Sequence, residues 1–224
     1  MEKQIAVAID GPVGAGKSTV AKLIAKKLGI IYVDTGAMYR TVGLYAVRHG
    51  ISTKDGEKLK EVLDDINLDV EIIDGVQNIF LNGENVSSLI RTPEISMAAS
   101  NVSAIPEVRT KLVDIQRNLA KSKSVIMDGR DIGTVVLPNA DTKIYLTATP
   151  EERANRRYKE LINRGNNVTY KEVYDDLILR DTQDSTREAS PLKAADDAIT
   201  LDTTGMSLEE VVEASIKLIN KEEN

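Results

Sequence analysis

The sequence of 224 residues contains no cysteine, no tryptophan, one phenylalanine and a single histidine. The lack of cysteine excludes a disulfide framework and a Cys-based zinc site, and a single histidine excludes a histidine-rich metal cluster. A metal ion is therefore expected to be a hard cation held by oxygen. No segment approaches eighteen uninterrupted apolar residues, so we expect a cytoplasmic protein without a membrane partner.

The chain also lacks an excess of basic residues, since its formal net charge is -6. A protein that coats nucleic acid normally needs a basic surface to displace counterions, so we expect no nucleic-acid partner. The composition of 42% hydrophobic and 29% charged residues suits one globular domain covering residues 1–224. Because there is no long exposed apolar stripe, we expect a monomer.

Apolar runs separated by helical patterns dominate the chain. The pattern predicts five strands, at residues 5–9, 30–33, 124–128, 143–148 and 197–202. Amphipathic helices are predicted after the first two strands and from residue 207 to about 221. The alternation predicts an α/β fold: a doubly wound, three-layer α/β/α core with a mostly parallel five-stranded sheet.

Residues 68–86 interrupt this alternation. Their period-two pattern, with Asp74-Gly75 and Asn82-Gly83 at the turns, predicts a small antiparallel β insert. We place the whole insert at about 67–97. No linker-like segment supports a separate domain boundary.

The stretch GPVGAGKST, residues 11–19, matches the phosphate-binding P-loop pattern and lies between an apolar strand and a helix. Its amide N–H groups and the helix N-terminus would bind the β-phosphate of a nucleotide. Lys17 would bridge the β and γ oxygens, and Ser18 would ligate Mg²⁺. The alternative is a glycine-rich turn that binds nothing.

P-loop proteins include switches, motors and kinases. The absence of particular motifs argues against the first two of these classes. A guanine-binding switch would carry N-K-x-D, but Asn220-Lys221 is followed by two glutamates. Motors and transporters are usually longer and carry further signatures. A small kinase is therefore the leading interpretation.

The stretch VIMDGRDIG, residues 125–133, contains the first acceptor candidates. Asp128 ends a strand, and Arg130 and Asp131 follow Gly129 at the carboxyl end, where ligands bind in open α/β sheets. Asp128 would contribute to the magnesium shell, through water. The alternative is a capped loop with a surface ion pair.

DTGAMYR, residues 34–40, follows the second strand in the same way. Arg40 lies one and a half helical turns from its start, where it could face the cleft. Thr35 is interpreted as the helix cap, whereas Asp34 has two open roles, orienting Lys17 or capping the helix.

Two arginine-rich segments follow. Arg153, Arg156 and Arg157 share one helical face, and we predict a helical lid at about 151–168. The downstream segment LRDTQDSTR supplies further candidates, namely Arg180, Asp184 and Arg187. The alternative for the first group is a solvated helix with Glu-Arg pairs.

The residue types also indicate the kind of acceptor. A hydroxyl acceptor would benefit from a general base, whereas a phosphate acceptor is already an anion that needs charge neutralisation and alignment. Many arginines and no suitable histidine favour the phosphate, since His49 is interpreted as a helix-end residue.

Taken in order, IDGPVGAGKST, DTGAMYR, the insert, ASNVSAIPEVR, MDGRDIGTVVLPNAD and LRDTQDSTREASPL resemble the bacterial cytidylate kinase family. The resemblance extends from about residue 5 to the final helix. It implies transfer of the γ-phosphate of ATP to CMP or dCMP with Mg²⁺.

The resemblance also implies roles for individual residues. The phosphates of ATP would contact Gly11, Pro12, Val13, Gly14, Ala15, Gly16, Lys17, Ser18 and Thr19, with Arg153, Arg156 and Arg157 from the lid. CMP would contact Thr35, Arg40, Ser100, Arg109, Arg130, Asp131, Arg180, Asp184 and Arg187. Catalysis would rest on Lys17, Arg130, Arg157 and Arg187.

Within CMP, the resemblance assigns the cytosine edge to Asp131 and Arg109. Cytosine presents an amino donor and two acceptors, which a carboxylate and an arginine complement. Two other functions stay open: a P-loop kinase for a different small acceptor, and a nucleotide-dependent switch that binds a macromolecular partner.

Overall fold

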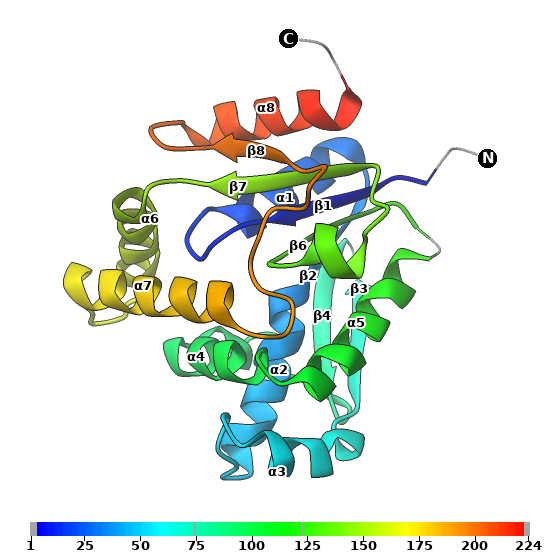
Figure 1. Ribbon diagram of the computed structural model, residues 1–224, viewed down its shortest axis with the longest axis vertical. Coiled ribbons are helices and arrows are strands. Elements are labelled where there is room, and N and C mark those ends of the chain that lie inside the picture. The colour runs from blue at the N-terminus through cyan, green and yellow to red at the C-terminus, as the bar shows by residue number, and fades with distance from the viewer. Residues whose placement is uncertain (1–3, 74, 122, 222–224) are drawn as a thin grey trace.

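Five strands form a central sheet in the spatial order β2-β6-β1-β7-β8 (Figure 1). The structure is a computed structural model that describes residues 4–73, 75–121 and 123–221. Every neighbouring pair in this sheet is parallel. The strands are β1 (Ala6–Asp10), β2 (Ile31–Asp34), β6 (Val125–Gly129), β7 (Thr142–Thr147) and β8 (Ile199–Asp202). The five predicted strands are confirmed, with ends that shift by one or two residues.

Helices cover both faces of this sheet. The helices of the described residues are α1 (Lys17–Leu28), α2 (Thr35–Arg48), α3 (Gly56–Glu61), α4 (Pro93–Val102), α5 (Pro106–Ala120), α6 (Pro150–Asn163), α7 (Tyr170–Thr186) and α8 (Leu208–Asn220). Three shorter helical turns are η1 (Leu63–Asp65), η2 (Leu89–Arg91) and η3 (Ile132–Val136). Within the described residues, none of these helices has the length and apolar character needed to span a bilayer.

The alternation of side chains along each strand separates two hydrophobic clusters. Val7, Ile9 and Ile126 face α1 and α8, whereas Ala8 and Met127 face the side covered by α2 and α5. This arrangement confirms the predicted three-layer core, because strands buried on both faces need helices on both sides.

The insert is an antiparallel sheet of β3 (Leu68–Ile73), β4 (Val76–Leu81) and β5 (Glu84–Asn85). Asn82 and Gly83 both have positive φ, as a type I′ hairpin turn requires, which confirms the second predicted turn. Asp74 of the first predicted turn lies outside the described residues.

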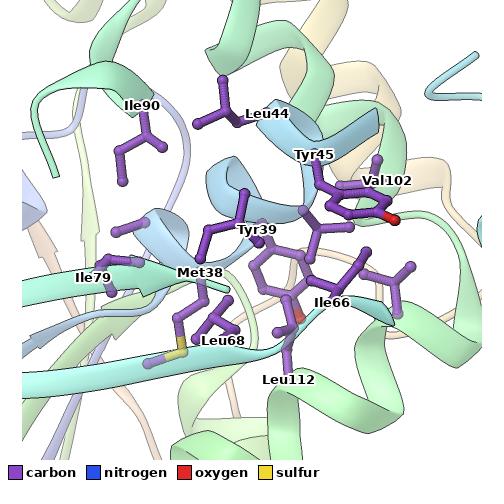
Figure 2. Packing of buried hydrophobic residues seen from close by; sticks show 14 of the residues in the cluster. Met38, Tyr39, Leu44, Tyr45, Ile66, Leu68, Ile79, Ile90, Val102 and Leu112 are labelled. Carbon is purple, nitrogen blue, oxygen red and sulfur yellow. The ribbon is translucent and has the colours of Figure 1, made fainter. Parts of the chain in front are cut away.

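Apolar side chains of the insert pack into the larger of the two clusters. Ile79 of β4 and Ile90 of η2 are fully buried there, together with Met38 of α2. Figure 2 shows this packing around Met38, Tyr39, Leu44, Tyr45, Ile66, Leu68, Ile79, Ile90, Val102 and Leu112. The insert therefore shares its hydrophobic core with the central sheet.

Candidate active site

The P-loop connects β1 to α1 at the carboxyl edge of the sheet. Gly11 has φ 148°, and a Cβ there would lie 2.0 Å from the Leu146 carbonyl oxygen, so only glycine fits. Helix α1 begins at Lys17 without a side-chain cap, because its N-cap residue is Gly16. The first N–H groups of the helix therefore remain available to an anion.

Lys17 is buried at this turn, and its Nζ donates to the Pro12 carbonyl oxygen at 2.7 Å. Burial, and then the neighbouring Arg130, lower the pKa of Lys17 to about 7. A bound polyphosphate would favour the charged ammonium and oppose this shift.

Ser18 and Asp128 meet beside the P-loop. The Ser18 hydroxyl donates to Asp128 Oδ2 at 2.8 Å, and the Tyr32 hydroxyl donates to Asp128 Oδ1 at 2.8 Å. Burial, followed by the charge of Asp34, raises the pKa of Asp128. The structure thus brings the two predicted magnesium residues together.

Oxygen donors of this kind fit a hard cation such as Mg²⁺. Among the described residues, no cluster of three or more histidine, cysteine or acidic side chains could hold a metal ion alone. The pair therefore fits an ion that nucleotide phosphates and water complete, as is usual for Mg²⁺ in phosphoryl-transfer enzymes.

A cavity of about 310 Å³ begins at Lys17 and Ser18 and extends toward the insert. It is lined by every predicted acceptor residue: Thr35, Arg40, Ser100, Arg109, Arg130, Asp131, Arg180, Asp184 and Arg187. These residues come from α2, α4, α5, the turn after β6, and α7 with its C-terminal end. The fold therefore gathers residues up to 152 positions apart in the sequence, from Thr35 to Arg187, around one space.

An ion pair between Arg109 and Asp131 forms one wall of the cavity, and both side chains are almost fully buried. Arg109 also donates to the Ser103 carbonyl oxygen at 3.0 Å and lies over the Tyr39 ring. Arg187 is 4.0 Å from Asp131, so one carboxylate faces two guanidiniums.

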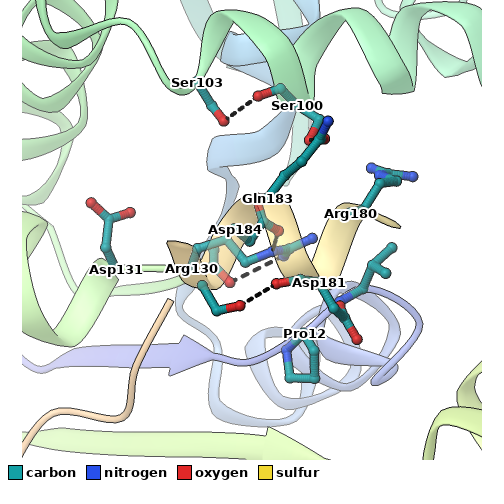
Figure 3. A network of polar contacts seen from close by, with 12 residues as sticks. Pro12, Ser100, Ser103, Arg130, Asp131, Arg180, Asp181, Gln183 and Asp184 are labelled. Atoms are coloured by element: carbon teal, nitrogen blue, oxygen red, sulfur yellow. Dashed lines mark hydrogen bonds and ion pairs between the residues drawn. The ribbon is translucent and has the colours of Figure 1, made fainter. Parts of the chain in front are cut away.

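Arg130 and Asp184 form a second pair, with Arg130 Nε donating to Asp184 Oδ2 at 2.7 Å (Figure 3). Burial alone would lower the pKa of Arg130, but Asp184 outweighs it and raises the pKa. Gln183 accepts from the Ser100 hydroxyl at 3.1 Å, which joins α7 to α4 (Figure 3).

Several guanidinium groups around this cavity have a nitrogen donor without a hydrogen-bond partner among the described residues. Arg40 Nε, Arg109 Nε and Arg187 Nη2 are buried and have no hydrogen-bond partner within the described part of the chain. Buried donors without partners are uncommon in folded proteins. Their gathering around one cavity fits a ligand rich in acceptor oxygens.

The sequence model of the cytidylate kinase family matches residues 7–221. The chain belongs to the cytidylate kinase family. It is 53% identical to the cytidylate kinase of Caldicellulosiruptor bescii, over 98% of this chain and 97% of that protein. It is 50% identical to the cytidylate kinase of Clostridioides difficile strain 630, over 96% and 98%.

Solved structures give the same fold at low identity. A gluconokinase from Sinorhizobium meliloti 1021 superposes with a TM-score of 0.51 at 14% identity, over 98% of this chain and 94% of that one. An uncharacterized protein from Eubacterium ventriosum gives 0.54 at 14%, over 98% and 99%. At 14% identity these likenesses show the fold alone.

The three arginines of the predicted lid have different surroundings. Arg153 is only 5% exposed and bonds inward, to the Ala148 and Val13 carbonyl oxygens and to Asp181. It lines neither large cavity, so its ATP contact stays a prediction with no geometric support beyond its bond to the P-loop backbone.

Arg156 and Arg157 both line a second, mostly apolar cavity of about 360 Å³, which shares Gly14, Gly16 and Thr19 of the P-loop with the first. Arg157 lines the first cavity as well, and it donates to Glu160 at 2.8 Å. The Glu152-Arg156 and Glu160-Arg164 pairs of the solvated-helix alternative are also present, at 2.9 and 2.7 Å.

The structure corrects the interpretation of Thr35. The cap of α2 is Asp34, whose Oδ1 accepts the Ala37 N–H at 2.9 Å. Thr35 is the first helical residue, and its hydroxyl donates to the Asp128 carbonyl oxygen at 2.7 Å. The capping prediction for Thr35 was wrong because both residues are good caps, and only the end of β2 decides between them.

Sequence reasoning missed Asp10 at the end of β1. Its carboxylate accepts the N–H groups of Ile132 and Gly133 at 2.8 and 2.7 Å, which anchors the turn that carries Asp131. Burial raises the pKa of Asp10 to about 6. The one sequence feature that could have pointed to Asp10 is its position directly before Gly11 of the P-loop.

Proposed function

We propose that the protein transfers the γ-phosphate of ATP to CMP or dCMP, giving ADP and CDP or dCDP. The observation that carries the proposal is that all nine predicted acceptor residues line one cavity that begins at Lys17 of the P-loop. Membership of the cytidylate kinase family and the close relatives named cytidylate kinase support the same acceptor.

ATP would lie across the P-loop, with its phosphates on residues 11–19. The second cavity suits the adenine ring, because apolar side chains of α1, α8 and the segment between β8 and α8 line it, namely Val20, Val211, Leu208 and Met206. Arg156 and Arg157 would approach ATP from the rim of that cavity.

Ser18 would hold Mg²⁺ directly and Asp128 through a water molecule. When bound, the ion supplies positive charge that neutralises the phosphate oxygens. Tyr32 keeps the Asp128 carboxylate aimed at Ser18, through the hydrogen bond to its other oxygen.

The acceptor phosphate would lie between Arg40 and Arg130, with Arg187 opposite. No general base is needed, since the attacking oxygen is already anionic. The chain's own contribution is to hold two polyanions together: Lys17, Arg130, Arg157 and Arg187 offset charge that would otherwise repel.

Asp131 and Arg109 would read the cytosine edge, with Thr35 and Ser100 nearby. Uracil would direct its O4 acceptor toward the Asp131 carboxylate, so that two acceptors would face each other with no donor between them. We therefore expect CMP to be preferred over UMP by about 1–3 kcal/mol, roughly tenfold to a hundredfold in kcat/KM.

The three predicted parts of the domain would act together: the core, the insert at about 67–97 and the lid at about 151–168. Closure of the lid over both nucleotides would exclude water that otherwise hydrolyses ATP. The monomeric state and the cytoplasmic location stay predictions.

A coupled ADP-release assay with Mg²⁺ and ATP tests the proposal. CMP, dCMP, UMP, AMP and shikimate are compared at equal concentration, and turnover is expected to be fastest with CMP and dCMP. Faster turnover with AMP or shikimate would favour a kinase for another acceptor. Folded protein that binds ATP but turns over none of them would favour the switch.

A further inference from the structure

The side chain of Gln77 leaves the insert and reaches the edge of the central sheet. Strand β2 is the edge strand, with β6 as its neighbour in that sheet. The Asp34 N–H donates to Gln77 Oε1 at 2.7 Å, and Gln77 Nε2 donates to the Asp34 carbonyl oxygen at 3.1 Å. One side-chain amide therefore pairs with both main-chain groups of the last residue of β2, as an adjacent strand would.

Asp34 in turn begins the acceptor side of the site. Its Oδ1 caps α2, while its Oδ2 accepts from Arg40 Nη2 at 2.8 Å. A Cβ on Gly36 would lie 3.2 Å from Arg40 Nη1, so the guanidinium packs closely over that glycine. The position of the Asp34 backbone thus fixes where the Arg40 guanidinium lies.

The insert reaches Asp34 a second time through Arg91 of η2, whose Nη2 is 3.9 Å from Asp34 Oδ2. Arg91 and Arg40 line the same cavity. Burial raises the pKa of Asp34, but Arg40, Arg91 and the Ala37 N–H outweigh it and hold the pKa below its ordinary value. Asp34 therefore stays a carboxylate at neutral pH, as its pairing with Arg40 requires.

We propose that Gln77 is a positioning residue for the acceptor phosphate. It holds the Asp34 backbone, Asp34 holds Arg40, and Arg40 binds the phosphate of the nucleoside monophosphate. This inference rests on the proposed function, and it connects the β insert to phosphate binding. Gln77 of the insert thus determines the position of Arg40, which lies on α2 and not in the insert.

Gln77→Met tests the inference, because methionine has a similar length and makes neither hydrogen bond. The KM for CMP is expected to rise about 5- to 30-fold, the size of effect that one or two lost hydrogen bonds produce. The KM for ATP is expected to stay within about twofold. Asn78→Ala is the matched control: it lies on the same strand, its side chain bonds within the insert alone as far as the described residues go, and the change should leave both constants unaltered.

Two further measurements separate positioning from general loosening. The dissociation constant of cytidine, which lacks the phosphate, should be the same in Gln77→Met and wild type. In an Arg40→Gln background, Gln77→Met should add little to the weakened binding of CMP. If Gln77→Met unfolds below the assay temperature, Gln77→Glu, which keeps the acceptor for the Asp34 N–H, takes its place with the same expected direction.

The outcomes distinguish this inference from the proposed function. Wild-type protein that does not phosphorylate CMP contradicts the proposed function. Wild-type activity together with an unchanged KM for CMP in Gln77→Met contradicts the inference. Equal weakening of cytidine and CMP, or full additivity with Arg40→Gln, also contradicts it.

Discussion

The two ends of the candidate active site are built in different ways. The donor end is a contiguous stretch, residues 11–19, in which main-chain N–H groups and one lysine would face the phosphates of ATP. The acceptor end consists of side chains from several helices and one turn, held in place by carboxylates. A backbone site depends on local conformation, whereas a side-chain site depends on ion pairs between distant segments. The following predictions test that difference.

The largest effect is expected from Arg130→Ala at the acceptor end. Removal of a guanidinium that neutralises transition-state charge typically costs about 10²–10³ in kcat. The fold should persist, because the Asp184 carboxylate would still have a guanidinium partner in Arg187, whose Nη1 lies 3.8 Å from it. Steady-state kinetics and thermal unfolding measure the two properties, and Arg48→Ala, in an exposed pair with Glu84, is the control. Unchanged kinetics would remove Arg130 from the site.

Asp131→Asn should alter selectivity more than rate. An amide can face either the amino group of cytosine or O4 of uracil, so the ratio of kcat/KM for CMP to that for UMP should fall by roughly tenfold to a hundredfold. The variant also breaks the pair with Arg109, so CMP binding weakens too. A preserved ratio would show that another residue reads the base.

The affinity of the donor end for ATP should depend on pH above about 7. Free protein loses the charge of Lys17 as pH rises through about 7, whereas ATP binding favours the charged form. The dissociation constant of ATP should therefore increase above pH 7, by at most about tenfold per pH unit. Calorimetry at several pH values measures it. Lys17→Arg stays charged and should lack this increase, and an equal slope in both proteins would exclude Lys17 as its source.

Thr35→Val should have the smallest effect, because it removes one neutral hydrogen bond between the two ends. Loss of the bond to the Asp128 carbonyl oxygen should lower the free energy of unfolding by about 1 kcal/mol. Denaturant unfolding measures it. Thr35→Ser keeps the hydroxyl and should retain most of the stability. Equal losses in both variants would assign the effect to methyl packing instead.

The donor end could be predicted from sequence because its signal is local. Glycines with positive φ, a buried strand before them and a helix after them all lie within about two dozen residues. The five strands and the turn at Asn82-Gly83 were predictable for the same reason. Most acceptor residues were also candidates from their positions, after the carboxyl ends of strands or in arginine-rich segments. Ser100 and Arg109 came only from resemblance to a family, since nothing in the spacing says that α4 and α7 face each other.

The remaining features depend on contacts that leave no pattern in the chain. Gln77 and Asp34 are 43 positions apart. Asp10 anchors a turn more than a hundred residues away. Arg153 shares a helical face with Arg157 in any helical projection, yet it is buried against the P-loop. In each case a polar side chain forms its hydrogen bonds with a segment that is far away in the sequence but adjacent in the fold.

The guanidinium nitrogens of Arg40, Arg109 and Arg187 that lack hydrogen-bond partners within the described residues have a thermodynamic consequence. Groups that have been desolvated without new partners make the free protein less stable than its packing alone would allow. A bound nucleotide that supplies acceptor oxygens would give these guanidinium nitrogens hydrogen-bond partners. Saturation with CMP at a hundred times its dissociation constant should raise the free energy of unfolding by about 2.7 kcal/mol. CMP would therefore act both as the phosphate acceptor and as a ligand that stabilises the folded state.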